Sequence, residues 1–408
     1  MAGVSPFREA PDPAAPNGTA LEKVYLYVLG PLLLPTTALF YAAKYLATAA
    51  PKRTSLRQYL GLQYIRVLLT GKPLGAPESW AAASESPKAG LGNNLVYGDS
   101  LQVNTVDVIT VPPISPAELV QHAALPTAAG GRVQPAERPG FVISPEAALG
   151  HGTAPAEPGE QLLLYIHGGA YVFGHPVADP FVWKAARDTG RRVFSVQYRK
   201  ATSPETAWPA PLLDALAAWA YVTGTLGFPA ASVHVMGCSA GGHLALALAQ
   251  QLHATGAAMP GALSLLSPWV DMTMSFPSIQ ARDVDYLTAD WLHAPVKSLA
   301  RYYTPEAVRG PLFSPVLAGA GHWSWLRIPV FISVGQIEGF IDELTAFADR
   351  LTEDGVPLTL NVDPDGIHSA PSLPFMPAYH YDDFVAGLRA QFDLMKTATP
   401  ASSPESTP

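Results

Sequence analysis

Short apolar runs separated by helix-like stretches dominate the chain from Gln161 onward. The runs occupy residues 162–166, 193–196, 233–236, 263–266, 330–334 and 358–362. Stretches with helical character lie between several of them, at 209–222, 240–253 and 342–354. Strands that are apolar on both faces are typical of a parallel sheet covered by helices on two sides. The pattern predicts an α/β fold with a mostly parallel central sheet and helices on both faces.

The composition restricts the class of protein further. The chain has 408 residues, of which 48% are hydrophobic and 14% charged, which favours one large folded domain with additions. Its 25 Lys and Arg residues are outnumbered by 33 Asp and Glu residues, so no basic excess is available to bind nucleic-acid phosphates. The single cysteine, Cys238, excludes an intramolecular disulfide and a cysteine-based zinc site. These observations argue against a nucleic-acid-binding protein.

The N-terminal region 21–50 is hydrophobic. Its segment 24–43 carries no charged residue, and a helix of that length spans roughly 30 Å, about the thickness of a bilayer core. We therefore predict membrane association through this segment, with a buried helix packed on the protein as the alternative. More basic residues follow the segment than precede it, which predicts a cytosolic main domain if it spans. Residues 1–20 and 399–408 are predicted to be flexible tails.

The remaining chain divides into two predicted parts. Residues 51–100 should form N-terminal cap helices, beginning with an amphipathic helix over 54–70. Residues 101–398 should form the main domain, with a first strand over 101–109. Within that domain, residues 126–160 are rich in Ala, Pro and Gly and show neither helical nor strand periodicity. We predict a long surface insertion there, between two early strands.

A candidate nucleophile lies between a predicted strand and a predicted helix. The sequence Gly237-Cys238-Ser239-Ala240-Gly241 is a G-x-S-x-G motif in the strand–turn–helix context that the motif requires. The small flanking residues permit a tight turn that presents Ser239 Oγ above the edge of the sheet. The following helix N-terminus favours developing negative charge. Ser239 is predicted to be a catalytic nucleophile, and a plain helix N-cap is the alternative.

A glycine-rich turn precedes this motif by about seventy residues. Strand 162–166 is followed by His167-Gly168-Gly169-Ala170, where consecutive glycines leave backbone N–H groups accessible. The N–H groups of Gly168 and Gly169, with that of Ala240, are predicted to form an oxyanion hole, and Ala170 is a further candidate. His167 is predicted to orient the loop by hydrogen bonding. The alternative is a turn that binds no ligand.

A catalytic serine needs a base held by a carboxylate, in the chain order serine, acid, histidine for this kind of sheet. His368 follows the last predicted strand and is the leading base, with His380 as the second candidate. Glu338 lies in the loop after strand 330–334 and is the predicted acid. Asp342 is the alternative acid, although it is expected in the first turn of the next helix, where a helix-dipole role suffices.

These motifs together resemble the α/β-hydrolase fold, in its hormone-sensitive-lipase-like branch, from about Leu101 to Leu394. His167-Gly168-Gly169 matches the oxyanion signature of that branch, and residues 237–242 match its G-D-S-A-G-G elbow, with Cys238 in place of the aspartate. Further similar segments are Tyr198-Arg199, Pro204-Glu205, Pro209-Ala210 and Ser267-Pro268-Trp269-Val270-Asp271. Glu338 lies where the branch more commonly has aspartate. Cys238 is expected to be a buried thiol that points into the sheet.

The resemblance implies an esterase or lipase that acts on hydrophobic carboxylic esters with a Ser239–His368–Glu338 triad and no metal or cofactor. It also implies a cap that includes about 272–326, with a helix pair over 285–303. Aromatic residues of this cap are expected either to line an acyl or alcohol pocket or only to pack the cap: Trp291, Tyr302, Tyr303, Trp323 and Trp325.

The chain is also similar to fungal steryl acetyl hydrolases and arylacetamide deacetylase, which carry an N-terminal hydrophobic segment. Those relatives face the lumen of the endoplasmic reticulum, whereas the flanking charges here favour the cytoplasm. Two alternatives to ester hydrolysis remain at this stage. One is acyl transfer from the same acyl-enzyme to an alcohol, and the other is a non-catalytic ligand-binding relative. The sequence does not indicate an oligomeric state.

Overall fold

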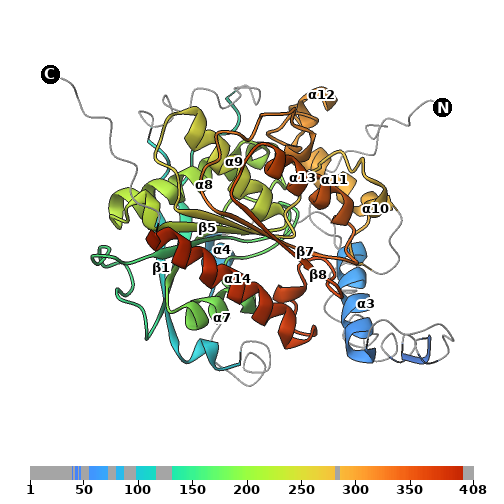
Figure 1. Ribbon diagram of the computed structural model, residues 1–408, viewed down its shortest axis with the longest axis horizontal. Helices are drawn as coiled ribbons and strands as arrows, with labels where there is room; N and C mark the ends of the chain where they lie inside the picture. Colours follow the sequence, from blue (N-terminus) through green and yellow to red (C-terminus); the bar gives the residue numbers. More distant parts are fainter. Residues whose placement is uncertain are drawn as a thin grey trace.

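The computed structural model describes residues 55–71, 80–86, 98–115, 131–280 and 285–397, with some positions between 39 and 46 (Figure 1). The predicted tails and nearly all of segment 24–43 lie outside these ranges. No helix of the described residues is both long enough and apolar enough to cross a membrane.

A single sheet organises the described chain. Its strands are β1 (Asn104–Val111), β2 (Arg138–Pro145), β3 (Leu162–Ile166), β4 (Arg192–Val196), β5 (Val233–Cys238), β6 (Ala262–Leu266), β7 (Val330–Gly335) and β8 (Leu358–Asp363). The eight strands of the described residues are ordered β1-β2-β4-β3-β5-β6-β7-β8. Strands from β4 to β8 in this order pair in parallel, and β1 and β2 are antiparallel additions. The predicted mostly parallel sheet is confirmed.

Helices cover both faces of this sheet (Figure 1). The described helices are α3 (Leu56–Gly71), α4 (Trp80–Ala83), α7 (Pro180–Thr189), α8 (Ala210–Ala220), α9 (Ala240–Ala254), α10 (Pro277–Gln280), α11 (Ala289–Leu299), α12 (Pro305–Val308), α13 (Ile341–Glu353) and α14 (Ala378–Thr397). Helices α8, α9 and α13 lie on one face, and α7 and α14 lie on the other.

Two hydrophobic clusters hold these layers together. Every residue of β3 and β4 is buried, because side chains on both faces of these strands contact helices. The larger cluster joins one sheet face to α8, α9 and α13, and the smaller one joins the other face to α7 and α14. Helix α9, which follows the serine motif, is buried over almost its whole length. The element that carries Ser239 therefore lies at the centre of the fold.

The predicted insertion at 126–160 is wrong in part, because strand β2 lies inside it. Seven of the eight β2 residues are buried, and the strand pairs with β1 on one side and β4 on the other. Its apolar residues Phe141–Ile143 form a short run between Pro139-Gly140 and Pro145, residue types that are rare inside strands. The local pattern is therefore weak, and pairing with two neighbouring strands determines the structure.

The two segments predicted to form the cap, 51–100 and about 272–326, contain several of the described helices. Helix α3 matches the extent of the helix predicted over 54–70. Segment 285–303 contains one helix, α11, instead of the predicted helix pair, and the next helix, α12, starts only at Pro305. In Figure 1, α3 lies beside the end of the sheet at which β7 and β8 are found, close to the loops that follow those strands.

Candidate active site

The carboxyl ends of the parallel strands bring the predicted site residues together. In the register of the sheet, Ile166 pairs with Gly237, and Gly335 pairs with Asp363. The loops that follow β3, β5, β7 and β8 therefore begin at the same edge. Such an edge is where α/β sheets usually bind ligands.

Ser239 occupies a strained turn between β5 and α9. Its backbone has φ 53° and ψ −120°, a conformation that side-chain-bearing residues rarely adopt. The turn is closely packed: a Cβ atom at Gly237 would lie 2.2 Å from the carbonyl oxygen of Gly241. Only glycine fits at this position, which explains why the motif requires small residues. The Ser239 N–H donates to Leu266 O at 2.9 Å, which fixes the turn to the neighbouring strand.

His368 lies within hydrogen-bond distance of the serine. Its Nε2 atom is 2.9 Å from Ser239 Oγ, and its Nδ1 atom is 3.6 Å from Glu338 Oε1. His368 is 2% exposed and Glu338 is fully buried. In space, the imidazole of His368 therefore lies between the Ser239 hydroxyl and the Glu338 carboxylate.

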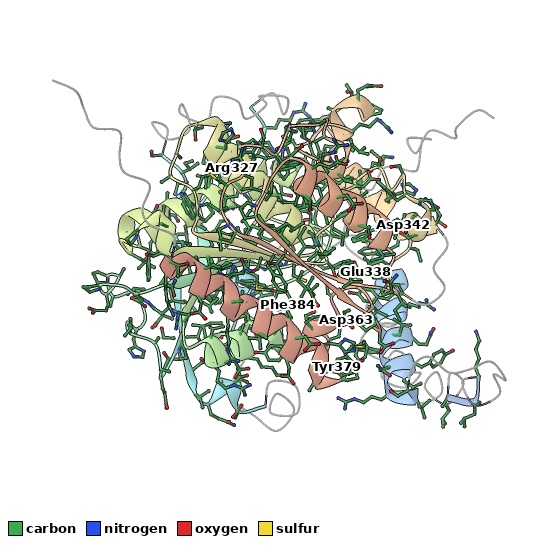
Figure 2. All side chains as sticks on the ribbon, viewed as in Figure 1. Arg327, Glu338, Asp342, Asp363, Tyr379 and Phe384 are labelled. Atoms are coloured by element: carbon green, nitrogen blue, oxygen red, sulfur yellow. The ribbon has the colours of Figure 1, made fainter. Side chains whose placement is uncertain are left out.

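The alternative candidates lie elsewhere. Asp342 is in the first turn of α13, where its Oδ2 accepts a 2.8 Å hydrogen bond from Ser278 N in α10. Figure 2 shows Glu338 and Asp342 at separate places, with Asp342 further from the sheet edge. His380, the second candidate for the base, is buried in α14, and its Nδ1 contacts the Asp363 carboxylate and not Ser239.

Ser267 contacts the predicted acid, Glu338, although no sequence pattern indicates this contact. Its Oγ donates a 2.7 Å hydrogen bond to Glu338 Oε2, which also accepts from Gly335 N at 2.9 Å. Ser267 Oγ in turn accepts from Ser369 N, next to His368, at 3.0 Å. The Ser267 hydroxyl thus joins the loop that carries Glu338 (the acid loop) to the loop that carries His368 (the base loop). The S-P-W-x-D motif contained this residue, but nothing in its spacing indicated the contact.

Backbone N–H groups face the serine from two loops. Among the described residues, no hydrogen bond uses the N–H of Gly168, Gly169 or Ala240. A Cβ atom at Gly168 would lie 3.2 Å from Ser239 Cβ, so this backbone passes directly beside Ser239. The arrangement leaves N–H donors free for an oxygen atom that develops negative charge beside Ser239.

Both ring nitrogens of His167 contact groups other than Ser239. Its Nε2 lies 2.9 Å from Gln197 Oε1, its Nδ1 lies 2.8 Å from Gly168 O, and its ring stacks on Tyr198 at 4.2 Å between centroids. Burial lowers the pKa of His167 to about 3. Its contacts match the predicted role of orienting the glycine-rich loop.

The Cys238 thiol is buried in the cluster beneath the site. Its Sγ lies 3.2 Å from Ser369 Oγ, and burial raises its pKa to about 12. A thiol with this pKa stays protonated and is a poor nucleophile. The departure from the usual aspartate therefore leaves a small packing residue that contacts the base loop.

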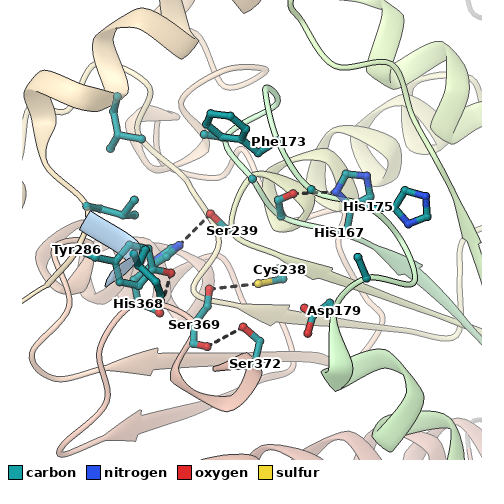
Figure 3. Close-up of a pocket in the computed structure, with 18 of the residues that line it drawn as sticks. His167, Phe173, His175, Asp179, Cys238, Ser239, Tyr286, His368, Ser369 and Ser372 are labelled. Atoms are coloured by element: carbon teal, nitrogen blue, oxygen red, sulfur yellow. Dashed lines mark hydrogen bonds between the residues drawn. The ribbon is translucent and has the colours of Figure 1, made fainter. Parts of the chain in front are cut away.

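A pocket of about 390 Å³ opens above Ser239 (Figure 3). One part is apolar and is formed by α3, by segment 287–292 and by the loop that follows β3: Ile65, Phe173, Leu287, Trp291 and Leu292. The rings of Phe173 and Trp291 stack at 6.0 Å between centroids and 16° between planes. Another part carries polar side chains, among them His175, Asp179 and Ser372. The pocket therefore has an apolar side that contains residues of both the cap and the main domain.

The cap aromatics divide between the two expected roles. Trp291 is the one among them that lines this pocket. Trp323 is fully buried against Phe347, and Trp325 stacks on His253 at 4.3 Å. Tyr303 packs on Phe313, and Tyr302 donates to Pro204 O. Four of the five therefore pack the cap and only one contacts the pocket.

Comparisons with known proteins identify the family of the chain. A family model described as the alpha/beta hydrolase fold matches residues 163–372. An acetyl-hydrolase of Streptomyces hygroscopicus is 33% identical over 239 residues, which cover 56% of this chain and 75% of the relative. An ethyl acetate hydrolase of Pseudomonas putida is 34% identical over 216 residues, which cover 50% of this chain and 64% of the relative. The matched segment is thus just under two thirds of the second relative.

Solved structures share the same fold. The crystal structure of a hormone-sensitive-lipase homologue from a metagenome library has a TM-score of 0.58 at 22% identity, covering 82% of this chain and 97% of the other. An esterase of the bacterial hormone-sensitive lipase family has a TM-score of 0.55 at 21% identity, covering 89% and 97%. With the family match and the sheet topology, these findings lead to one conclusion: the chain belongs to the α/β-hydrolase family, with the fold seen in hormone-sensitive-lipase-type esterases.

Proposed function

We propose that the chain is a serine carboxylic-ester hydrolase with Ser239 as nucleophile, His368 as general base and Glu338 as the carboxylate that orients the imidazole. The observation that carries this proposal is the 2.9 Å contact between His368 Nε2 and Ser239 Oγ at the strained turn. A non-catalytic relative would have no need to keep that contact. Relatives named as acetyl-hydrolase and ethyl acetate hydrolase support the same activity.

The reaction proceeds in two halves. Ser239 Oγ attacks the ester carbonyl carbon while His368 Nε2 takes the hydroxyl proton, and the carbonyl oxygen becomes an oxyanion. The N–H groups of Gly168, Gly169 and Ala240 stabilise that oxyanion. The intermediate collapses, and the alcohol leaves with the proton from His368. Water then attacks the acyl-enzyme with the same base and releases the carboxylic acid.

The pocket supports esters with a compact apolar part. Stacking of Phe173 on Trp291 places two aromatic rings on the apolar side of a pocket of about 390 Å³. Burying an acyl chain against such a wall contributes about 0.8 kcal/mol for each methylene group. A wall of two stacked rings also limits how long that chain can be. We therefore propose short hydrophobic esters as the substrate class.

Replacing the nucleophile tests the activity. Ser239→Ala should lower kcat for p-nitrophenyl acetate by about 10⁴–10⁶-fold, and a fluorophosphonate probe should label the wild type but not the variant. Circular dichroism and thermal unfolding serve as the control for folding. Activity above a tenth of wild type in a folded Ser239→Ala variant contradicts the assignment.

Membrane association through residues 24–43 is a separate proposal, which rests on the uncharged sequence alone. After alkaline carbonate extraction, the full chain should stay in the pellet, and a chain that starts at Thr54 should be in the supernatant. Recovery of both chains in the supernatant contradicts an integral anchor.

A further inference from the structure

A second carboxylate lies beside the base in addition to Glu338. Asp285 belongs to the cap segment, and it is fully buried at the junction between the acid loop and the base loop. Nothing in the sequence motifs distinguishes it. Burial raises the pKa of the Asp285 carboxyl above its usual range, while the neighbouring His368 acts in the opposite direction. Such a site for a carboxylate is costly unless its oxygens accept several hydrogen bonds.

Both oxygens of Asp285 accept backbone hydrogen bonds from the triad loops. Oδ2 accepts from Gly339 N, the residue after Glu338, at 2.8 Å. Oδ1 accepts from Tyr286 N at 2.7 Å and from His368 N at 3.4 Å. One carboxylate therefore links the backbone next to the acid with the backbone of the base.

Tyr286, the residue after Asp285, contacts the carbonyl group and the ring of His368. Tyr286 Oη donates to the His368 carbonyl oxygen at 3.0 Å, and the two rings meet edge to face at 5.7 Å between centroids. Figure 3 shows Tyr286 against His368 on the side away from the loop that follows β3. The N–H and the C=O of His368 thus both contact the dipeptide Asp285-Tyr286.

The N-terminal helix fixes this dipeptide in turn. Arg66 in α3 donates from Nη2 and Nε to the Asp285 carbonyl oxygen, at 2.5 and 3.1 Å. The contact joins residues 219 positions apart in the chain. A continuous set of hydrogen bonds therefore runs from α3 through Asp285 to both catalytic loops.

Given the proposed hydrolase function, we propose that Asp285 is a positioning residue that holds the acid loop and the base loop at the separation needed for the Glu338–His368 contact. Only a carboxylate accepts on both sides. An asparagine here would direct its NH₂ group at a backbone N–H, either that of Gly339 or those of Tyr286 and His368. One of the two loops would then lose its partner and shift. Small displacements of catalytic groups cost about 10²-fold in rate.

Asp285→Asn tests this proposal against Asp354→Asn. Asp354 is a matched control because its two oxygens also accept backbone N–H groups of the cap segment, from Gly321 and Trp323, both at 2.8 Å. It lies at the far end of α13, roughly 20 Å from the acid loop for a helix of this length. The substrate is p-nitrophenyl acetate, and the rate of fluorophosphonate labelling reports the reactivity of Ser239 without a bound ester.

We expect Asp285→Asn to lower kcat and the labelling rate together by about 10–100-fold, with KM changed by less than about threefold. Asp354→Asn should leave kcat unchanged. Wild-type kcat in folded Asp285→Asn overturns the positioning role, and so does a loss that appears in KM alone. If the wild type itself neither hydrolyses esters nor labels, the proposed function fails instead, and the two failures are thereby distinguished.

Should Asp285→Asn not fold, Arg66→Met provides the same test. It removes the donor to the Asp285 carbonyl oxygen and leaves the carboxylate in place. We expect kcat to fall by roughly three- to tenfold with KM near the wild-type value, because Asp285 is then less firmly held. A kcat equal to that of the wild type contradicts the proposal.

Discussion

Glu338 Oε1 lies 3.6 Å from His368 Nδ1, and both atoms are buried with no hydrogen-bond partner among the described residues. The separation is longer than a hydrogen bond, and in ligand-free sites such contacts commonly tighten when substrate binds. The other oxygen of Glu338 is already fixed by Ser267 and Gly335. Oε1 therefore remains available to the imidazole, which is the arrangement expected of a triad acid.

Substitution of the acid should distinguish the two carboxylates after β7. Glu338→Gln should lower kcat by about 10³–10⁴-fold, because the charge that stabilises the imidazolium is lost. Asp342→Asn should cost less than about tenfold, with any further effect on stability, since Asp342 binds Ser278 N in place of the imidazole. The measurement is kcat for both folded variants. If Asp342→Asn is the more damaging, the roles are exchanged.

A side chain at Gly168, in the predicted oxyanion hole, should slow the chemical step. A Cβ atom at Gly168 would lie 3.0 Å from Cys238 O and 3.2 Å from Ser239 Cβ, so Gly168→Ala should displace the N–H donor from its place beside the serine. We expect kcat to fall by about 10²–10³-fold. Gly224→Ala is the control, because no atom lies within 4 Å of its added Cβ. Equal kcat values in the two variants would show that the Gly168 N–H does not stabilise the oxyanion.

Removal of the stacked ring should change acyl-length preference. Trp291→Ala opens the apolar wall opposite Phe173. The ratio of kcat/KM for p-nitrophenyl octanoate to that for the acetate should rise by about tenfold. Trp325→Ala, whose ring stacks on His253 outside the pocket, should leave the ratio unchanged. A ratio unaffected by Trp291→Ala would show that other residues limit the chain length.

Buried histidines should make the protein acid-labile. Burial lowers the pKa of His167 and His234 to about 3 and of His243 to about 4, whereas the unfolded chain titrates near 6.5. Below about pH 6.5 the unfolded state binds more protons than the folded state, so stability falls as the pH falls toward 4. Asp179 acts against this loss of stability. Burial raises the pKa of its carboxyl to about 6, so as the pH falls below about 6 the folded state binds a proton that the unfolded state does not yet bind.

His234→Gln tests that dependence outside the active site. His234 lies on β5 with its Nε2 2.8 Å from Ser264 Oγ, away from the pocket. The unfolding free energy is measured by urea unfolding between pH 4 and 6.5, and its slope against pH gives the number of protons taken up on unfolding. We expect this number to decrease by about one. An unchanged slope would show that His234 does not titrate differently in the folded state.

Much of the fold was predictable from local sequence because the determining patterns are local. The runs that predicted β3 to β7 are buried on both faces, and that property requires no knowledge of the partner strand. The run that predicted β8 contains polar residues and leaves Leu360 and Val362 exposed. The turn at Ser239 was predictable because close backbone packing admits only small residues there. His368 and Glu338 followed from their positions after the last two strands, since parallel strands end at one edge of a sheet.

Tertiary structure decided the features that depend on partners distant in the chain. Strand β2 forms because β1 and β4 pair with it, although its own residues favour a turn. Trp291 lines the pocket while Trp323 is buried, because the path of the cap and not the residue type determines which ring meets Phe173. Ser267 contacts Glu338 across 71 residues, and Asp285 contacts His368 across 83 residues. Such long-range hydrogen bonds leave no periodic or compositional signal, so only the folded chain reveals them.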